Sequence, residues 1–116
     1  MNVWFVYMVR AARSTLYTGI STDVDRRLDC HAAGRGSKFL RGRSPLTVVY
    51  RRKIGDHGLA LAVERRLKAL TKTKKESIVV RAPSRARLLR ILQLDPSSRR
   101  ISSPRARMAS RERAGK

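Results

Sequence analysis

Two β-prone apolar segments separated by only a few residues limit the fold of this chain more than any other feature. Residues Val3–Val9 are continuously apolar, which predicts a central strand buried on both faces. Residues Thr15–Ile20 form a second β-prone segment after a turn over Ala11–Ser14. Because so short a connection suits a hairpin, we expect these two strands to pair antiparallel.

The remainder of the folded part alternates between helix and strand patterns. Ser21 and Thr22 are candidate N-caps for a helix that includes residues 26–31 and stops before Gly34. A third strand is predicted over Leu46–Tyr50, and Asp56 is placed to cap a helix over about residues 58–70. Further helices are expected over residues 73–81 and 84–94. This order predicts an α+β domain with a small three-stranded antiparallel sheet flanked by helices.

The charge of the chain predicts a polyanionic partner. The sequence has 28 Lys and Arg against 8 Asp and Glu, a net charge of +20, and nucleic acid is the simplest partner for such a protein. From Asp95 onward the sequence is dominated by Ser, Pro, Arg and Ala, a composition that predicts disorder. We therefore divide the chain into a folded domain over residues 1–94 and a basic, disordered tail over residues 95–116.

Several classes of protein are disfavoured by the sequence. A single cysteine, Cys30, cannot form an internal disulfide, which favours a reducing compartment. No apolar run approaches the ~20 residues of a membrane span, and Val3–Val9 lacks the flanking features of a signal peptide. We expect a cytoplasmic, nucleoid-associated protein with no membrane contact, and no protein partner is evident.

Two pairs of residues near the start of the chain are candidates for chemistry. Tyr7 and Tyr17 lie on the two predicted hairpin strands, so their hydroxyls can approach each other; alternatively both are ordinary sheet aromatics. Arg27 and His31 are four residues apart and share one side of a helix. The alternative for this pair is an exposed arginine with a half-buried histidine.

Glu64 is the third candidate. It is the sole acidic residue in residues 57–75 and borders the apolar stripe of a predicted helix. Its carboxylate is a hard oxygen ligand suited to Mg²⁺, which commonly uses one or two carboxylates together with waters and phosphate oxygens. The alternative is an ion pair with Lys68 one turn later.

Taken together, these residues resemble the GIY-YIG nuclease domain. Phe5-Val6-Tyr7 stands at the position of the "GIY" element, and Tyr17-Thr18-Gly19 stands at the "YIG" element ten residues later. Arg27 and His31 fall on the following helix and Glu64 on a later one. The segments WFVYMVR, LYTGISTDVDRRL and ALAVERRLKALTK are similar to the small single-domain bacterial branch of the family. The resemblance covers about residues 2–80.

The resemblance implies a metal-dependent endonuclease that hydrolyses phosphodiester bonds. Glu64 would hold a single Mg²⁺ or Mn²⁺ on the scissile phosphate. Tyr7 would act as general base on the attacking water, with His31 accepting a proton. Arg27 would stabilise the charge of the transition state, and Tyr17 would orient water or phosphate.

The remaining candidate residues are a glycine on the second strand and a set of basic residues that could bind the substrate. Gly19 would leave room for close approach after the second strand. A Gly-rich basic loop and a later lysine are expected to contact phosphates rather than base edges, which implies low sequence specificity; these binding residues are Arg35, Lys38, Arg41, Arg43 and Lys72. The alternative for the loop is an ordinary solvated segment.

Two functional hypotheses follow. The first is an enzyme that cleaves DNA, in preference to RNA, or structured nucleic acid during DNA repair or processing. The second is a non-catalytic, basic nucleic-acid-binding protein that retains the GIY-YIG fold. No asparagine matches the one that many family members carry beyond the glutamate helix, because Thr71, Lys72 and Lys74 stand there.

Overall fold

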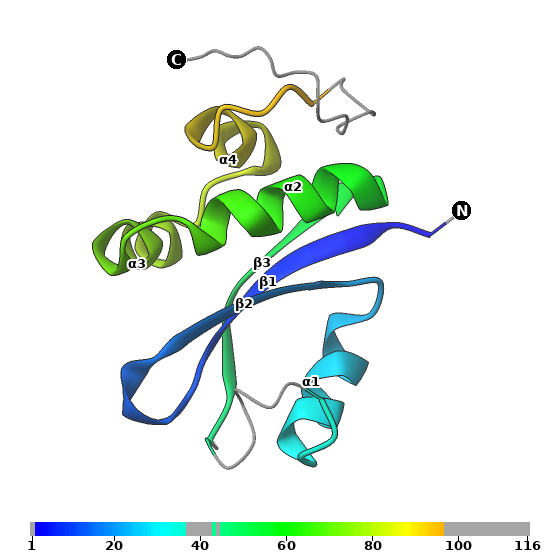
Figure 1. The fold of residues 1–116 in the computed structure, drawn as a ribbon, viewed down its shortest axis with the longest axis vertical. Helices are drawn as coiled ribbons and strands as arrows, with labels where there is room; N and C mark the ends of the chain where they lie inside the picture. The colour runs from blue at the N-terminus through cyan, green and yellow to red at the C-terminus, as the bar shows by residue number, and fades with distance from the viewer. Residues whose placement is uncertain (1, 37–42, 44, 97–116) are drawn as a thin grey trace.

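A computed structural model describes residues 2–36, 43 and 45–96 and contains a three-stranded antiparallel sheet with helices on both faces (Figure 1). The strands are ordered β2-β1-β3, so the N-terminal strand is central. The predicted α+β class and sheet are thereby confirmed. In chain order the elements are β1 (Trp4–Arg10), the 3-10 turn η1 (Ala12–Ser14), β2 (Leu16–Ser21), α1 (Val24–Ala32), β3 (Thr47–Gly55), α2 (His57–Lys68), α3 (Lys72–Arg81) and α4 (Arg85–Ile91).

Strand β1 is central because both of its faces are apolar. Val6 and Met8 point to one core, which they share with α2, α3 and α4, and Tyr7 and Val9 point to a second core shared with Val24 of α1. Figure 1 shows α2 and α1 on opposite sides of the sheet. Each aliphatic side chain fully buried in this way stabilises the fold by about 1.5–3 kcal/mol. Tyr7 is thus fixed between β1 and α1.

The register of the hairpin brings the two predicted tyrosines to the same face. Tyr7 pairs with Gly19, and Val9 pairs with Tyr17. Directly paired residues of an antiparallel sheet project on the same side. Tyr17 therefore lies diagonally across from Tyr7 on the same face of the sheet. Gly19, which is directly opposite Tyr7, has no side chain on that face.

The N-cap of helix α1 lies one residue after Thr22 and two residues after Ser21, the two predicted caps. Asp23 is the N-cap, and its carboxylate accepts a hydrogen bond from the amide of Arg26 at 3.1 Å. Ser21 and Thr22 were the wrong residues, because the Ser21 hydroxyl instead accepts from the Asp23 amide at 3.0 Å and shapes the turn before the helix. Aspartate is as good an N-cap as serine, so the sequence alone did not separate them.

Strand β3 is longer than predicted. The apolar pattern ends at Tyr50, but the strand continues to Gly55 through Arg51, Arg52 and Lys53, which pair with residues of β1. β3 is an edge strand, and edge strands tolerate charged side chains that face solvent. Helix α4 ends at Ile91 rather than Leu94, since Gln93 adopts a left-handed φ of 61° that cannot continue a helix.

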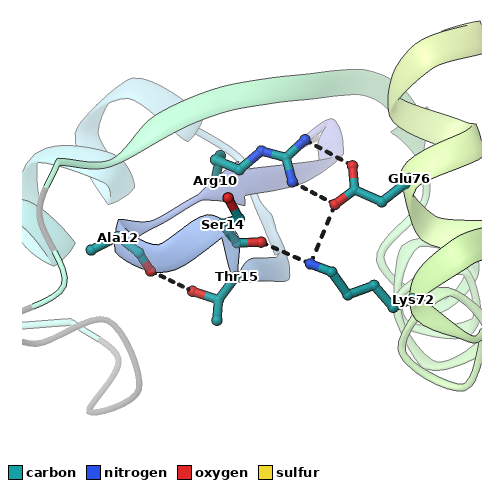
Figure 2. Close-up of polar contacts among 6 residues, drawn as sticks. All are labelled: Arg10, Ala12, Ser14, Thr15, Lys72 and Glu76. Atoms are coloured by element: carbon teal, nitrogen blue, oxygen red, sulfur yellow. Dashed lines mark hydrogen bonds and ion pairs between the residues drawn. The ribbon is translucent and has the colours of Figure 1, made fainter.

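An ion-pair network joins α3 to the end of the hairpin (Figure 2). The Arg10 guanidinium donates to both Glu76 carboxylate oxygens, at 2.5 and 2.8 Å. The Lys72 ammonium lies 3.3 Å from the same carboxylate and donates to the Ser14 carbonyl at 2.7 Å. Ser14 has a left-handed φ of 61°, which is a strained conformation for a residue other than glycine. The hydrogen bond from Lys72 therefore stabilises a strained turn. The hydrogen bond from Arg10, with smaller contributions from Lys72, lowers the pKa of Glu76 to about 2.

This pKa predicts how acid weakens the fold. A carboxylate whose pKa falls on folding adds stability above the pKa of the unfolded chain and loses it as pH drops to the folded value. We expect Glu76→Gln to lower the urea midpoint at pH 6–7, and the difference from wild type to shrink below about pH 4.5 and vanish near pH 2. Asp25→Asn removes an exposed carboxylate paired with Arg51 and should change little. A pH-independent effect of Glu76→Gln would contradict this assignment.

The predicted domain boundary lies close to the end of the described residues. The boundary at residue 94 follows the last helix, and the predicted tail falls almost entirely outside the described residues, which end at 96. Within the described ranges, no helix has the length and apolar character needed to cross a membrane.

Candidate functional site

A buried hydrogen bond between Tyr7 and His31 forms the centre of the candidate site. The Tyr7 Oη lies 3.1 Å from Nε2 of His31, and both side chains are 1% exposed. Tyr7 comes from the middle of β1 and His31 from the last turn of α1, which therefore packs a polar group against the sheet. His31 is therefore more deeply buried than the half-buried histidine that was the alternative interpretation.

Two glycines make room for these rings. A Cβ on Gly19 would lie 2.5 Å from Tyr7 Oη and 2.7 Å from its Cζ, and a Cβ on Gly36 would collide with the imidazole of His31. Neither position can accept a side chain unless the ring moves. Gly19 thus has the close-approach role expected from the sequence, with the tyrosine ring as the neighbour, whereas Gly36 was not singled out.

Tyr17 completes an aromatic group on this face. Its ring centroid lies 6.5 Å from that of Tyr7 and 5.5 Å from that of His31, the latter in an edge-to-face arrangement. Edge-to-face pairs at such distances are favourable. The structure therefore brings together the three ring residues that the sequence placed on two strands and a helix.

The electrostatic environment keeps both partners of the central hydrogen bond uncharged at neutral pH. Burial, reinforced by Tyr17, raises the pKa of Tyr7 to about 12, while Arg27 acts in the opposite direction and Glu64 raises it slightly further. Burial and the nearby charge of Arg27 lower the pKa of His31. A neutral His31 with its proton on Nδ1 accepts the hydrogen bond from the Tyr7 hydroxyl.

Arg27 and Glu64 approach Tyr7 from different helices. Arg27 is exposed on α1, while the Glu64 side chain on α2 is 20% exposed. Both act electrostatically on the Tyr7 hydroxyl. Lys68, one turn after Glu64, places its ammonium 3.3 Å from the carboxylate and 5.9 Å from the centroid of the Tyr17 ring. The alternative considered for Glu64, a pair with Lys68, is thus present, and it lies beside the tyrosines.

The predicted binding residues are only partly within the described residues. Arg35 is exposed just after α1, and Arg43 is half-buried, its carbonyl accepting a hydrogen bond from the Ala12 amide at 2.8 Å. Lys38 and Arg41 lie outside the described residues. The Lys72 side chain is 61% exposed and is bound into the network with Glu76 and Ser14.

Comparison with known proteins identifies the family of this chain. The family model of the GIY-YIG catalytic domain matches residues 3–77, which contain every residue of the Tyr7–His31–Glu64 arrangement. The chain belongs to the GIY-YIG family. The small GIY-YIG protein YhbQ, of the UPF0213 group, is 48% identical in Escherichia coli K12 and 47% identical in Escherichia coli O157:H7. Each alignment has 93 residues and covers 80% of this chain and 93% of the relative.

One solved structure is also similar. The solution NMR structure of the UPF0213 protein BH0048 from Bacillus halodurans is 32% identical and covers 80% of this chain and 99% of that chain, with a TM-score of 0.48. Its name, like that of YhbQ, states no activity. Membership of the GIY-YIG family, shown by the family model, indicates a nuclease-type domain.

GIY-YIG nucleases generally use a divalent metal, and Glu64 fits such an ion as one hard oxygen ligand. Residues 2–36, 43 and 45–96 contain no group of three or more His, Cys, Asp or Glu side chains able to enclose a metal. A Mg²⁺ site built from one or two carboxylates, with waters and substrate phosphate oxygens, needs no such group. The half-buried Glu64, whose neighbouring cation is a flexible lysine, satisfies this smaller requirement.

The close packing at Gly19 leads to a specific prediction for this GIY-YIG site. Gly19→Ala forces the Tyr7 ring out of its position, and overpacking of this kind costs about 1–3 kcal/mol of stability. We expect a lower melting temperature and at least a tenfold loss of any nuclease activity. Gly55→Ala is the control, since it strains a φ of 117° but meets no atom within 4 Å. Equal activity losses in the two variants, at matched folded fractions, would show that Gly19 has no specific role.

Proposed function

We propose that this protein is a metal-dependent endonuclease that hydrolyses phosphodiester bonds in DNA or structured nucleic acid with low sequence specificity. The observation that carries the proposal is the buried Tyr7–His31 hydrogen bond, with Arg27 and Glu64 acting electrostatically on the same hydroxyl. Perturbed titratable groups gathered at one place are typical of catalytic sites. A protein that only binds nucleic acid has no use for such an arrangement.

In this proposal Tyr7 and His31 act together as the base. A phenol with a pKa of about 12 is protonated at neutral pH, so it accepts a proton from water only while it gives up its own. The attacking water loses a proton to Tyr7 Oη as the Tyr7 hydroxyl proton passes to Nε2 of His31, 3.1 Å away. The products of this step are a hydroxide, a neutral Tyr7 and a protonated His31.

Arg27 and Tyr17 would position and stabilise the phosphate. The exposed Arg27 guanidinium can donate two parallel hydrogen bonds to phosphate oxygens, the geometry that suits arginine. Because Arg27 acts on the Tyr7 hydroxyl, its charge would lie close to the proposed point of attack. Tyr17, partly exposed on the edge strand β2, would hydrogen-bond the water or a phosphate oxygen.

Glu64 would hold a Mg²⁺ or Mn²⁺ ion, which, when bound, supplies positive charge to the leaving oxygen. Lys68 pairs with this carboxylate at 3.3 Å, and its side chain is 53% exposed, so its ammonium can turn outward toward solvent or phosphate. The Glu64 carboxylate would then be accessible to an ion without a permanent protein cage.

Substrate binding is assigned to basic side chains near this arrangement. Arg35 and Arg43 flank α1 and the hairpin turn, and we place Lys38 and Arg41 of the same loop in this role. Lys72 would contribute charge from α3 through its exposed ammonium. Contacts of this kind are made with phosphates, which supports low sequence specificity. Action on DNA in preference to RNA and association with the nucleoid are further parts of this proposal.

The tail is proposed to increase affinity without contributing to the fold. Residues 95–116 contain 7 basic and 2 acidic side chains. A variant truncated after Leu94 should keep its melting temperature, while the slope of log K for DNA against log salt becomes shallower by about 0.9 for each phosphate that the tail no longer neutralises. Circular dichroism and fluorescence anisotropy at several salt concentrations measure both quantities. A large drop in melting temperature would contradict the division at residue 94.

Incubation of the purified protein with supercoiled plasmid, single-stranded DNA and RNA tests the proposed function. We expect cleavage with Mg²⁺ or Mn²⁺, none with EDTA, and more cleavage of DNA than of RNA. The competing hypothesis, a non-catalytic nucleic-acid-binding protein, predicts binding of the same substrates with no cleavage under any of these conditions.

A further inference from the structure

A groove between α3 and α4 lies outside the arrangement around Tyr7. Its volume is about 790 Å³, within the ~300–1,000 Å³ typical of ligand-binding pockets. Its lining is mainly aliphatic and basic, with two serines: Leu70, Ile78 and Ile91 provide apolar surface, and Lys74, Arg81 and Arg87 provide positive charge. None of the residues assigned to phosphodiester chemistry lines this groove.

The α3 wall of the groove is held in place by the protein itself. Glu76 ties α3 to β1 through Arg10, as Figure 2 shows, while Lys74, Ser77 and Arg81 of the same helix line the groove. An anchored wall does not have to be ordered when a ligand binds.

The corner after α3 and the start of α4 are held as well. Tyr50 Oη donates to the carbonyl of Pro83 at 2.8 Å, and Arg85 Nε donates to that of Ile54 at 2.8 Å. Ala82 adopts a left-handed φ of 45° between the helices. The groove is therefore preformed between two anchored helices.

The charged side chains that line the groove are all basic. The lining contains three cations and no acidic side chain, and Lys74, Arg81 and Arg87 take no part in the ion pairs among the described residues. Ile91 is 45% exposed, although a large aliphatic side chain gains free energy when it is covered. A fitting ligand would combine apolar surface with negative charge.

We propose that this groove binds an acidic amphipathic peptide segment of a partner protein. Apolar side chains at helical spacing would cover Leu70 and Ile91, while carboxylates would pair with the basic rim, a recurring mode of peptide recognition. The Arg-rich tail of this chain and a second copy carrying +20 charge would both be repelled by that rim. Single-stranded nucleic acid would need aromatic side chains for stacking, and the lining has none.

Selection from a random peptide library displayed on phage tests this proposal with the full-length protein. Peptides are first depleted on Ile91→Asp protein and then selected on wild type in the presence of excess duplex DNA, which removes binders to the general positive surface. We expect the selected peptides to carry Asp or Glu together with Leu, Ile or Phe at spacings of three and four. A representative synthetic peptide should lose at least tenfold in affinity on Ile91→Asp and on Arg81→Glu.

Arg65→Glu is the matched control, because Arg65 is an exposed arginine on α2 that does not line the groove. It should change peptide affinity by less than twofold. The proposal is overturned if no peptide survives depletion, if the survivors lack acidic and apolar residues, or if Arg65→Glu weakens binding as much as Arg81→Glu. A larger loss of oligonucleotide affinity in Arg81→Glu than in Arg65→Glu would also overturn it, and would assign the groove to nucleic acid.

Discussion

Glu64→Gln is expected to reduce cleavage by about 10³-fold, which corresponds to about 4 kcal/mol of transition-state stabilisation. Glutamine keeps the shape of the side chain but lacks the charge that a divalent cation requires. Because Glu64 is the one carboxylate among the described residues that acts on Tyr7, no neighbouring acid can replace it. Initial rates on supercoiled plasmid at saturating protein measure the loss.

A second readout separates metal binding from other causes. Glu64→Gln should weaken Mn²⁺ binding, followed by electron paramagnetic resonance, while its affinity for DNA in EDTA stays within about twofold of wild type. Asp29→Asn removes an exposed carboxylate from α1 and should leave both quantities unchanged. If Glu64→Gln cleaves at the wild-type rate, the metal site has been assigned to the wrong residue.

Tyr7→Phe is expected to reduce cleavage by about 10²–10⁴-fold, the usual contribution of general acid–base catalysis. The substitution removes the hydroxyl that relays the proton and leaves the His31 ring without this hydrogen bond. Loss of one buried hydrogen bond costs about 1–3 kcal/mol of stability, so rates are compared at a temperature where both proteins are folded. DNA affinity should be nearly unchanged.

Tyr50→Phe is a matched control for this experiment. Tyr50 is also buried, and its hydroxyl donates to the Pro83 carbonyl at 2.8 Å, but it belongs to the other core. Tyr50→Phe should lose comparable stability and keep full cleavage. Equal activity losses in the two variants would mean that stability, and not the proton relay, limits the rate.

The pH profile tests the same relay. His31 must be neutral to accept the proton, and its pKa lies below 6.5 because of burial and the charge of Arg27. Cleavage by wild type should therefore be constant near neutral pH and fall only at a more acid pH than an ordinary histidine would give. The opposite trend, an increase in cleavage at acid pH, would exclude His31 as the acceptor.

The sequence predicted the centre of the fold and most of the candidate site because both depend on local patterns. The apolar run containing Tyr7 is typical of a buried strand, and the short turn before Tyr17 favours an antiparallel partner, as the register confirms. The four-residue spacing placed Arg27 and His31 on one helix. These constraints act within about 30 residues, where chain geometry leaves few alternatives.

Features that depend on distant packing were not predictable in the same way. The extension of β3 through Arg51 to Gly55 follows from its position at the sheet edge, which no local pattern reveals. The complete burial of His31 arises from contact with the sheet and with Gly36. Likewise, the hydrogen bond from Lys72 to the Ser14 carbonyl joins parts of the chain 58 residues apart.

The central claim is that this basic GIY-YIG domain cuts nucleic acid with the residues around Tyr7. The most direct test measures the fraction of plasmid bound and the fraction cleaved in the same reaction, for wild type, Tyr7→Phe and Glu64→Gln with Mn²⁺. We predict equal binding by all three proteins and cleavage by wild type alone. Binding without cleavage by wild type would support the non-catalytic alternative, and cleavage by all three proteins would place the chemistry elsewhere.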